Sequence, residues 1–347
     1  MSDSPALAAG DIVEAIVKDH VQPTLAVLMA SFLEQVTYRD SDFPMTESAY
    51  ADFQETMVSS LRNLLIPNGL ECHVEEIETR ALGTITLDVR LVHVQPEGVA
   101  VPIVLCLPAG SGSARGVACY SGHSAHGLRD LLEPDSYQAG IACRLAEAGF
   151  ATVAVEKLDT GTLVRTVGKG SDEPQIASHL LAWGDCTRSL QIRACLAAVE
   201  TLMEHPRVEG PVGAVGVSLG GWLAVITALL DERIAAVADF GMKTRFLPPD
   251  RLPADYDGIF DPCHILPGLN RLGDRNLIPL ALAPRRLLAG HGAADPASSA
   301  QAEPHYRRLQ QAQYAALGAA DRFAWHVHPG GDTLPPQPVI DFFRDAL

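Results

Sequence analysis

The chain has 347 residues, of which 47% are hydrophobic and 20% charged. This is a globular composition, long enough for one large α/β domain with an additional segment or for two smaller domains. The formal net charge of −16 argues against nucleic acid and anionic membranes as partners, because both need a cationic surface. No stretch approaches the roughly 18 to 20 apolar residues of a membrane span, and Met1–Ser4 lacks the basic residues of a secretory signal. We therefore expect a cytoplasmic protein that acts on a small molecule.

Residues 1–70 are predicted to form a helical N-terminal extension. Apolar residues such as Phe53, Met57 and Leu61 recur at three- and four-residue steps, which is the spacing of one helix face. Pro67-Asn68-Gly69 ends the region. Such regular spacing indicates that the extension packs on the main body or on a partner subunit, so a homodimer is also plausible on this pattern.

From residue 71 onward the pattern predicts an α/β domain over 71–347. Three segments rich in Val, Ile, Leu and Thr (72–79, 84–94 and 100–107) alternate with a period of two and predict antiparallel strands that lead into a sheet. Strands and helices then alternate: strands 115–120, 150–155, 211–216, 233–239, 286–290 and 322–328, and helices near 136–148, at 186–204 and 219–230, near 302–317 and at 336–346. This alternation predicts a mostly parallel sheet covered by helices on both faces.

One stretch of the chain does not fit this alternation of strands and helices. The stretch 243–282 carries several prolines and glycines and is predicted to be a lid-like insertion above the sheet. Met242, Phe246, Phe260 and His264 in or beside it suggest a roof for a partly apolar ligand, or only the insertion's own small core.

The seven cysteines (72, 106, 119, 143, 186, 195 and 263) form no CxxC pair, and most lie in apolar stretches. We interpret them as small buried side chains in a reducing compartment.

The sequence Gly216-Val217-Ser218-Leu219-Gly220-Gly221 lies between an apolar strand and an apolar helix. A serine on so sharp a turn needs neighbours without bulk, and glycines two residues before and after it supply them. The following helix begins with free N–H groups that can stabilise an oxyanion, the Leu219 N–H among them. This context predicts a nucleophile elbow with Ser218 as the nucleophile.

A second oxyanion donor is expected in the loop that follows strand 115–120. There Gly122 allows the backbone to turn inward, and the His123 N–H is the expected donor. His123 and His126 could be read as a metal pair, but no carboxylate or cysteine cluster accompanies them. We expect neither a metal nor a cofactor.

The remaining catalytic groups should follow the last strands. Asp295 lies on a loop beyond strand 286–290 and is the expected acid, with Asp239 in reserve. Chain order places the base near 330–333, but no histidine occurs after His328. His326 and His328 are the candidates, and Asp332 stands where an imidazole is expected.

Residues 71–347 resemble the acetyl xylan esterase, cephalosporin deacetylase and dienelactone hydrolase-like branch of the α/β-hydrolases. The resemblance rests on five segments: Leu196–Leu202, Val215–Gly221, Leu230–Ile234, Leu266–Leu269 and Ala283–Leu288. It implies an α/β-hydrolase fold with Ser218 as nucleophile and Asp295 as acid. The family's oxyanion loop usually begins His-Gly, where this chain has Ser121-Gly122. Its closing motif usually ends in histidine, where this chain has Gly330-Gly331-Asp332.

Three functions are compatible with that last departure. In the first, His328 or His326 supplies the base, and the protein is a serine hydrolase that cleaves a carboxylic ester, thioester or lactone through an acyl-enzyme on Ser218. In the second, the scaffold performs non-hydrolytic chemistry as a lyase, decarboxylase, isomerase or cyclase, with Asp332 as acid/base if burial beside Asp295 raises its pKa. In the third, catalysis is lost and the chain is a binding protein. An ordinary carboxylate, with a pKa of about 4, is a weak base for serine.

Overall fold

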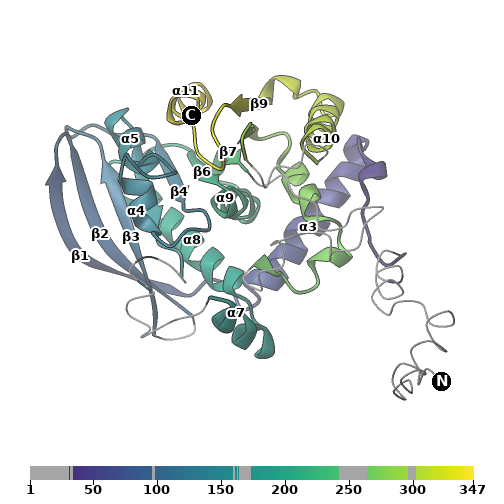
Figure 1. Cartoon of the computed structure of the whole chain (residues 1–347), viewed down its shortest axis with the longest axis horizontal. Helices are drawn as coiled ribbons and strands as arrows, with labels where there is room; N and C mark the ends of the chain where they lie inside the picture. Colours follow the sequence, from purple (N-terminus) through teal and green to yellow (C-terminus); the bar gives the residue numbers. More distant parts are fainter. Residues whose placement is uncertain are drawn as a thin grey trace, which may run out of the picture.

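The computed structural model describes residues 31, 34–95, 98–158, 161, 163, 173–241, 264–295 and 302–347. Its centre is a nine-stranded sheet with the strand order β1-β2-β3-β5-β4-β6-β7-β8-β9 (Figure 1). Strands β1 (Cys72–Leu82), β2 (Ile85–Val94) and β3 (Val99–Leu107) form an antiparallel meander, and β3 also pairs antiparallel with β5. The antiparallel lead-in predicted from the sequence is confirmed.

The other strands run parallel, as the alternation of strands and helices predicts. They are β4 (Gly116–Tyr120), β5 (Ala151–Val155), β6 (Val212–Val217), β7 (Ile234–Phe240), β8 (Arg286–Gly292) and β9 (Phe323–His328). Their carboxyl ends therefore meet at one edge of the sheet, where the loops after β4, β6, β8 and β9 come together. In open sheets of this kind, ligands bind at that edge.

Helices cover both faces of the sheet, and each face has its own apolar cluster because neighbouring strand residues point in opposite directions. One cluster includes residues of α4 (Leu128–Leu132), α5 (Ile141–Glu147) and α11 (Pro336–Ala346). The other includes residues of α3 (Glu47–Leu65), α8 (Thr187–Glu204), α9 (Leu219–Leu230) and α10 (Ala302–Ala316). The remaining helical elements are α7 (Glu173–Ala182) and the short 3₁₀ helices η1 (Asp40–Asp42), η4 (Leu269–Arg271), η5 (Arg275–Leu282) and η6 (Ala320–Arg322).

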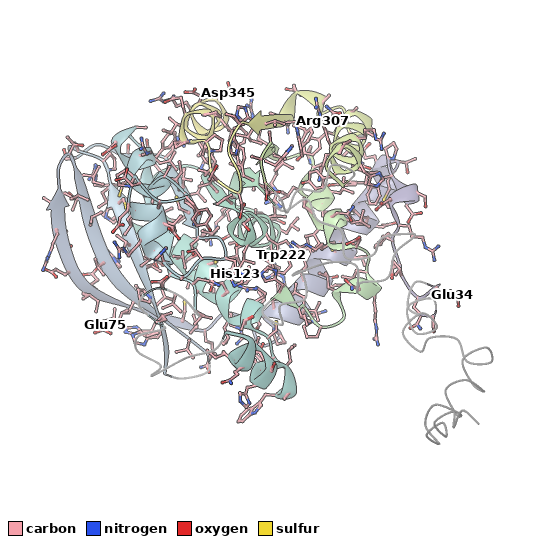
Figure 2. The ribbon with its side chains drawn as sticks, in the orientation of Figure 1. Glu34, Glu75, His123, Trp222, Arg307 and Asp345 are labelled. Atoms are coloured by element: carbon pink, nitrogen blue, oxygen red, sulfur yellow. The ribbon has the colours of Figure 1, made fainter. Side chains whose placement is uncertain are left out.

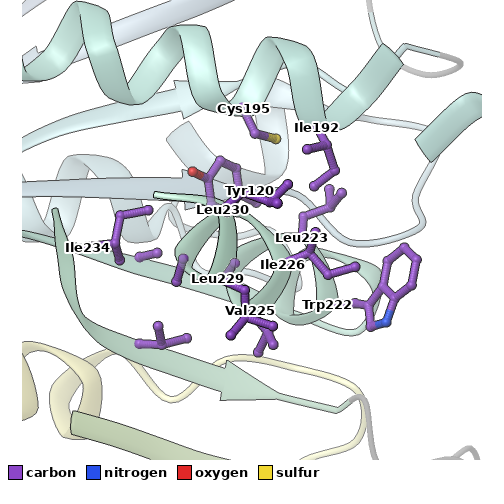
Figure 3. Close-up of a cluster of buried hydrophobic side chains, with 14 of the residues drawn as sticks. Tyr120, Ile192, Cys195, Trp222, Leu223, Val225, Ile226, Leu229, Leu230 and Ile234 are labelled. Carbon is purple, nitrogen blue, oxygen red and sulfur yellow. The ribbon is translucent and has the colours of Figure 1, made fainter. Parts of the chain in front are cut away.

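Helix α9 is apolar along its whole length, and every one of its residues is buried. Figure 3 shows why: its side chains pack against Ile192 and Cys195 of α8 on one side and approach Ile234 of β7 on another. A helix that is apolar all round belongs in the interior. This packing fixes α9, and with it the turn that precedes the helix.

Helix α3 packs on the main body, one of the two alternatives left open by the sequence. Phe53, Met57, Leu61 and Leu65 on its inner face are at most 1% exposed. The Tyr50 hydroxyl donates to the carbonyl oxygens of Leu280 (2.8 Å) and Ala283 (2.6 Å). Helix α3 is therefore part of the core. Residues 1–30, also predicted to be helical, lie outside the described residues.

The structure corrects three expectations. The helix expected near 136–148 begins only at Ile141, because Ala139 and Gly140 adopt positive φ angles of 55° and 59°. Cys72 is exposed, because β1 is an edge strand, whereas Cys106, Cys119, Cys143, Cys186 and Cys195 are buried as expected and Cys263 lies outside the described residues.

The third correction concerns the stretch 243–282. All of η5 is buried, and it packs against α9 and α3. Residues 275–282 are therefore core rather than roof. Met242, Phe246 and Phe260, proposed to roof the site, lie outside the described residues. No helix among the described residues has the length and apolar character needed to cross a membrane.

Candidate active site

Ser218 forms the turn between β6 and α9. Its backbone has φ 55° and ψ −125°, a conformation rarely adopted by a residue with a side chain and one that costs roughly 1 to 3 kcal/mol. The Ser218 N–H donates to the Phe240 carbonyl oxygen at 2.6 Å, which ties the turn to β7. The elbow predicted from the sequence is present, with its backbone strain at the expected serine.

The glycines around Ser218 are required by close backbone contacts. A Cβ atom at Gly216 would lie 2.1 Å from the Gly220 carbonyl carbon, and one at Gly220 would lie 2.2 Å from the Tyr120 carbonyl oxygen. A Cβ at Gly221 would lie 2.3 Å from Asp239 Oδ1. The motif is therefore explained by backbone packing, as the sequence predicts.

Asp332 lies beside Ser218, on the loop after β9. A Cβ atom at Gly241 would lie 2.9 Å from Asp332 Oδ1 and 2.9 Å from the Ser218 nitrogen, so both residues lie against Gly241. The buried Oδ1 of Asp332 has no hydrogen-bond partner among the described residues. Burial raises the pKa of Asp332 to about 6, with a further contribution from the negative charge of Asp295. A hydrogen bond with the Ser218 side chain opposes this rise.

His328 is held by its own loop. Its Nδ1 accepts a hydrogen bond from the Gly330 N–H (3.2 Å), so the ring proton is assigned to Nε2, which donates to the Thr333 carbonyl oxygen (3.0 Å). Burial lowers the pKa of His328. The hydrogen bonds of both ring nitrogens thus hold the loop that carries Asp332. In the described part of the chain, neither His328 nor His326 makes a hydrogen bond with Ser218.

The expected acid, Asp295, is buried on the loop after β8. This loop is joined to the one after β9, because the Ala293 N–H donates to the His328 carbonyl (2.7 Å) and the Ala294 N–H to that of Gly330 (2.9 Å). The two loops bring Asp295 close enough to Asp332 to raise its pKa. Asp239, the reserve candidate, lies under the first turn of α9 beside Gly221 instead.

The oxyanion loop lies against the elbow. A Cβ at Gly122 would be 2.8 Å from the Val217 carbonyl oxygen, so glycine is needed here too. With its amide oriented to donate to the Tyr120 carbonyl, Gln138 accepts from the Gly122 N–H at 3.1 Å. The Gly122 N–H therefore serves the loop, and the His123 N–H stays the donor expected from the sequence. Figure 2 labels His123 and, on α9, Trp222.

The His123 ring lies 5.2 Å from the ring of His264, centroid to centroid. Burial and the nearby positive charges of Arg188 and Arg275 lower the pKa of His264 to about 2, so this ring is neutral. No three histidine, cysteine, aspartate or glutamate side chains gather closely enough to hold a metal ion in the part of the chain that the structure describes. The groups that the structure fixes at this edge are thus a serine hydroxyl, two carboxyls and backbone N–H groups, the kinds of group that acyl transfer uses.

Sequence reasoning missed Tyr137, whose hydroxyl would lie 2.1 Å from a Cβ at Gly122. The residue belongs to no motif, and its position in a predicted helix hid it. It also missed the buried basic residues Lys157, Arg188 and Arg275. Only the spacing of Arg188 among apolar residues at the start of helix 186–204 could have suggested that one.

Comparison with known proteins gives a family match over part of the chain. Residues 126–252 match the Dienelactone hydrolase family. The curated Bacillus subtilis (strain 168) protein YtaP, whose name describes a hydrolase, is 25% identical over 213 residues. That match covers 58% of this chain and 66% of YtaP, so the chain spans just under two thirds of this relative.

Solved structures show the same fold over most of the chain. A Bacteroides fragilis protein whose name is that of an acetyl xylan esterase superposes with a TM-score of 0.70 at 15% identity, covering 100% of this chain and 97% of its own. Methylesterase BT1017 superposes with a TM-score of 0.65 at 20% identity, covering 91% of this chain and 67% of its own. A glucuronoyl esterase from Solibacter usitatus has a TM-score of 0.58 at 15% identity, covering 84% of this chain and 91% of its own. The chain therefore has an α/β-hydrolase-like fold, and its residues 126–252 are similar to the Dienelactone hydrolase family.

Proposed function

We propose that the protein hydrolyses carboxylic esters through an acyl-enzyme on Ser218, with Asp332 as the general base. The observation that carries this proposal is the contact between the two side chains together with the raised pKa of Asp332, about 6. An unperturbed imidazole has a pKa of about 6.5. Burial therefore gives this carboxyl nearly the basicity of the histidine that is expected at its position.

The chemistry follows the usual two stages of acyl transfer. The Ser218 oxygen attacks the ester carbonyl carbon while Asp332 takes the hydroxyl proton, and the oxyanion faces the N–H groups of Leu219 and His123. The protonated Asp332 then returns its proton to the leaving oxygen as the C–O bond breaks, which releases the alcohol. Water repeats the sequence on the acyl-enzyme, releases the carboxylic acid and restores both side chains.

Three of the structural neighbours bear the names of esterases, which supports an ester as the substrate. A thioester or lactone would be cleaved by the same steps. His328 is not given the role of base, because its acceptor nitrogen is already bound by the Gly330 N–H. Abstracting a proton from Ser218 would require breaking that bond and moving the ring out of its loop.

The test uses p-nitrophenyl acetate turnover and labelling by a fluorophosphonate, read by mass spectrometry of the intact protein. Ser218→Ala should lose both, and Asp332→Asn should lower kcat/KM by roughly 10²- to 10⁴-fold, as loss of a catalytic base does. The matched control is Ser59→Ala, an exposed serine on α3, which should behave as wild type. Wild-type turnover that survives in Ser218→Ala would refute the acyl-enzyme.

Other outcomes separate the remaining alternatives. Full activity in Asp332→Asn would exclude Asp332 as the base while leaving Ser218 in place. If the wild type shows neither labelling nor turnover but keeps its fold, the non-hydrolytic and binding functions become the better explanations.

A further inference from the structure

Tyr137 lies in the turn Ser136–Gly140, between α4 and α5, and hydrogen bonds hold the first two residues of this turn. The Ser136 hydroxyl donates to the Asp130 carbonyl oxygen at 2.6 Å. The Tyr137 carbonyl accepts from the Leu334 N–H at 3.4 Å, two residues beyond Asp332. The backbone of Tyr137 is thus tied to the loop that carries the proposed base.

The side chain of Tyr137 reaches the oxyanion loop. Its hydroxyl oxygen lies 2.1 Å, and its ring carbon Cζ 3.2 Å, from the position that a Cβ would take at Gly122. Gly122 in turn lies against the carbonyl oxygen of Val217, the residue before Ser218. The hydroxyl is therefore next to the elbow, and the charge of Asp332 acts on it strongly enough to raise its pKa.

The Tyr137 hydroxyl makes a different hydrogen bond from those of the buried residues Tyr50 and Tyr314. Tyr50 donates to the carbonyl oxygens of Leu280 and Ala283, and Tyr314 donates to that of Arg285 (2.8 Å), as buried hydroxyls usually do. The Tyr137 hydroxyl oxygen instead accepts a hydrogen bond from the Gly122 N–H, and a hydroxyl that accepts one hydrogen bond can still donate its own proton. Burial and the charges of Asp332 and Asp130 hold its pKa well above the ordinary value of 10, so it keeps that proton at every working pH.

We propose that Tyr137 is a catalytic residue, whose hydroxyl donates a hydrogen bond to the oxyanion of the tetrahedral intermediate beside the amides of Leu219 and His123. This inference rests on the proposed function. The contact with Gly122 places the hydroxyl on the oxyanion side of the nucleophile. The leaving oxygen receives its proton from Asp332, so the phenol stays neutral throughout the cycle.

The experiment compares Tyr137→Phe with wild type on p-nitrophenyl acetate and on ethyl acetate. Loss of one oxyanion donor lowers kcat by roughly 10²- to 10³-fold in a well-studied case; we expect a loss of about 10- to 100-fold here, because two amides remain, with KM changed by less than about threefold. The loss should be equal for both esters. Affinity for a trifluoromethyl ketone, which forms an oxyanion adduct on Ser218, should fall by the same factor.

The matched control is Tyr38→Phe, a partly buried tyrosine that packs on Phe53 of α3. It should keep wild-type kinetics. A second variant, Gly122→Ala, should displace the Tyr137 hydroxyl and lower kcat, and the two losses should be less than additive in the double variant.

The outcomes distinguish this inference from the function it depends on. An unchanged kcat in Tyr137→Phe, with turnover still abolished by Ser218→Ala, overturns only the role of Tyr137. A loss that is much larger for ethyl acetate than for p-nitrophenyl acetate also overturns it, since that pattern belongs to an acid that protonates the leaving group. Wild-type turnover that is independent of Ser218 refutes both.

Discussion

Replacing Asp332 by asparagine should stabilise the protein while removing its activity. The pKa of Asp332 rises from its ordinary 3.8 to about 6 on folding. At 1.36 kcal/mol for each pH unit, this rise means that the ionised carboxylate lowers the free energy of unfolding by about 3 kcal/mol at neutral pH. Asparagine has a similar shape and no charge, so the variant should recover much of this energy.

The pH dependence of the free energy of unfolding shows the direction in which Asp332 acts. A carboxyl whose pKa is raised in the folded state contributes its full stability below about 3.8, and loses it as the pH rises through about 6. Between pH 5 and pH 8 the wild type should therefore lose about 1.4 kcal/mol that Asp332→Asn does not lose. The difference between the two proteins should grow with pH and level off above pH 7.

The assay is equilibrium unfolding in urea at pH 5, 6, 7 and 8, with kcat/KM measured on the same preparations. Asp135→Asn, which replaces an exposed aspartate, is the matched control and should leave the pH dependence of stability as it is in the wild type. An unfolding free energy for Asp332→Asn that runs parallel to wild type over this range would refute the buried, strongly perturbed carboxylate. The argument for Asp332 as a base would then fail as well, because it depends on the raised pKa.

Further predictions concern the same site. The kcat/KM of the wild type should rise as the pH increases through about 6 and then stay level, because only the ionised Asp332 accepts a proton; a pH–rate profile checks this. Asp295→Asn should move the rise to lower pH, since it removes a charge that raises the pKa of Asp332. His328→Gln, whose amide can replace both ring hydrogen bonds, should keep kcat within about threefold, as measured on p-nitrophenyl acetate. The free energy of unfolding of Ser218→Gly should exceed that of Ser218→Ala by about 1 kcal/mol or more, because glycine tolerates the φ of 55° at this position. Urea titration of both variants measures the difference.

The fold is largely predictable from the sequence because its signals are local and strong. All nine strands occur where the apolar patterns place them, and α9 begins at Leu219 as predicted. The predicted start of α5 is wrong because positive φ at a non-glycine residue, here Ala139, has no sequence signature. Helix η5 falls within the predicted lid because a proline inside it argues against regular structure, whereas burial against α9 and α3 is a tertiary effect.

The candidate site is predictable only where the backbone determines it. Gly216 and Gly220 mark close contacts between main chains, as Gly122 does with the Val217 carbonyl oxygen, and such contacts leave a motif. The role proposed for Tyr137 depends on a side chain that crosses from another turn, and no pattern records that. For Asp332, the sequence supplies the identity of the residue and its neighbour Asp295. The size of the pKa rise depends on burial, which only the folded chain provides.

An aspartate in place of the expected imidazole also changes what the second carboxylate has to do. A histidine base needs a partner that fixes its tautomer and orientation, because only one of its nitrogens faces the serine. A carboxylate needs no tautomer partner, and here the loop is already held by His328 through Gly330 and Thr333. Asp295 keeps an electrostatic role, since its charge raises the pKa of Asp332 toward that of the missing imidazole. The elbow and its amides are set by backbone packing and do not depend on which base is present, so a change at position 332 can alter the base while leaving the rest of the catalytic geometry intact.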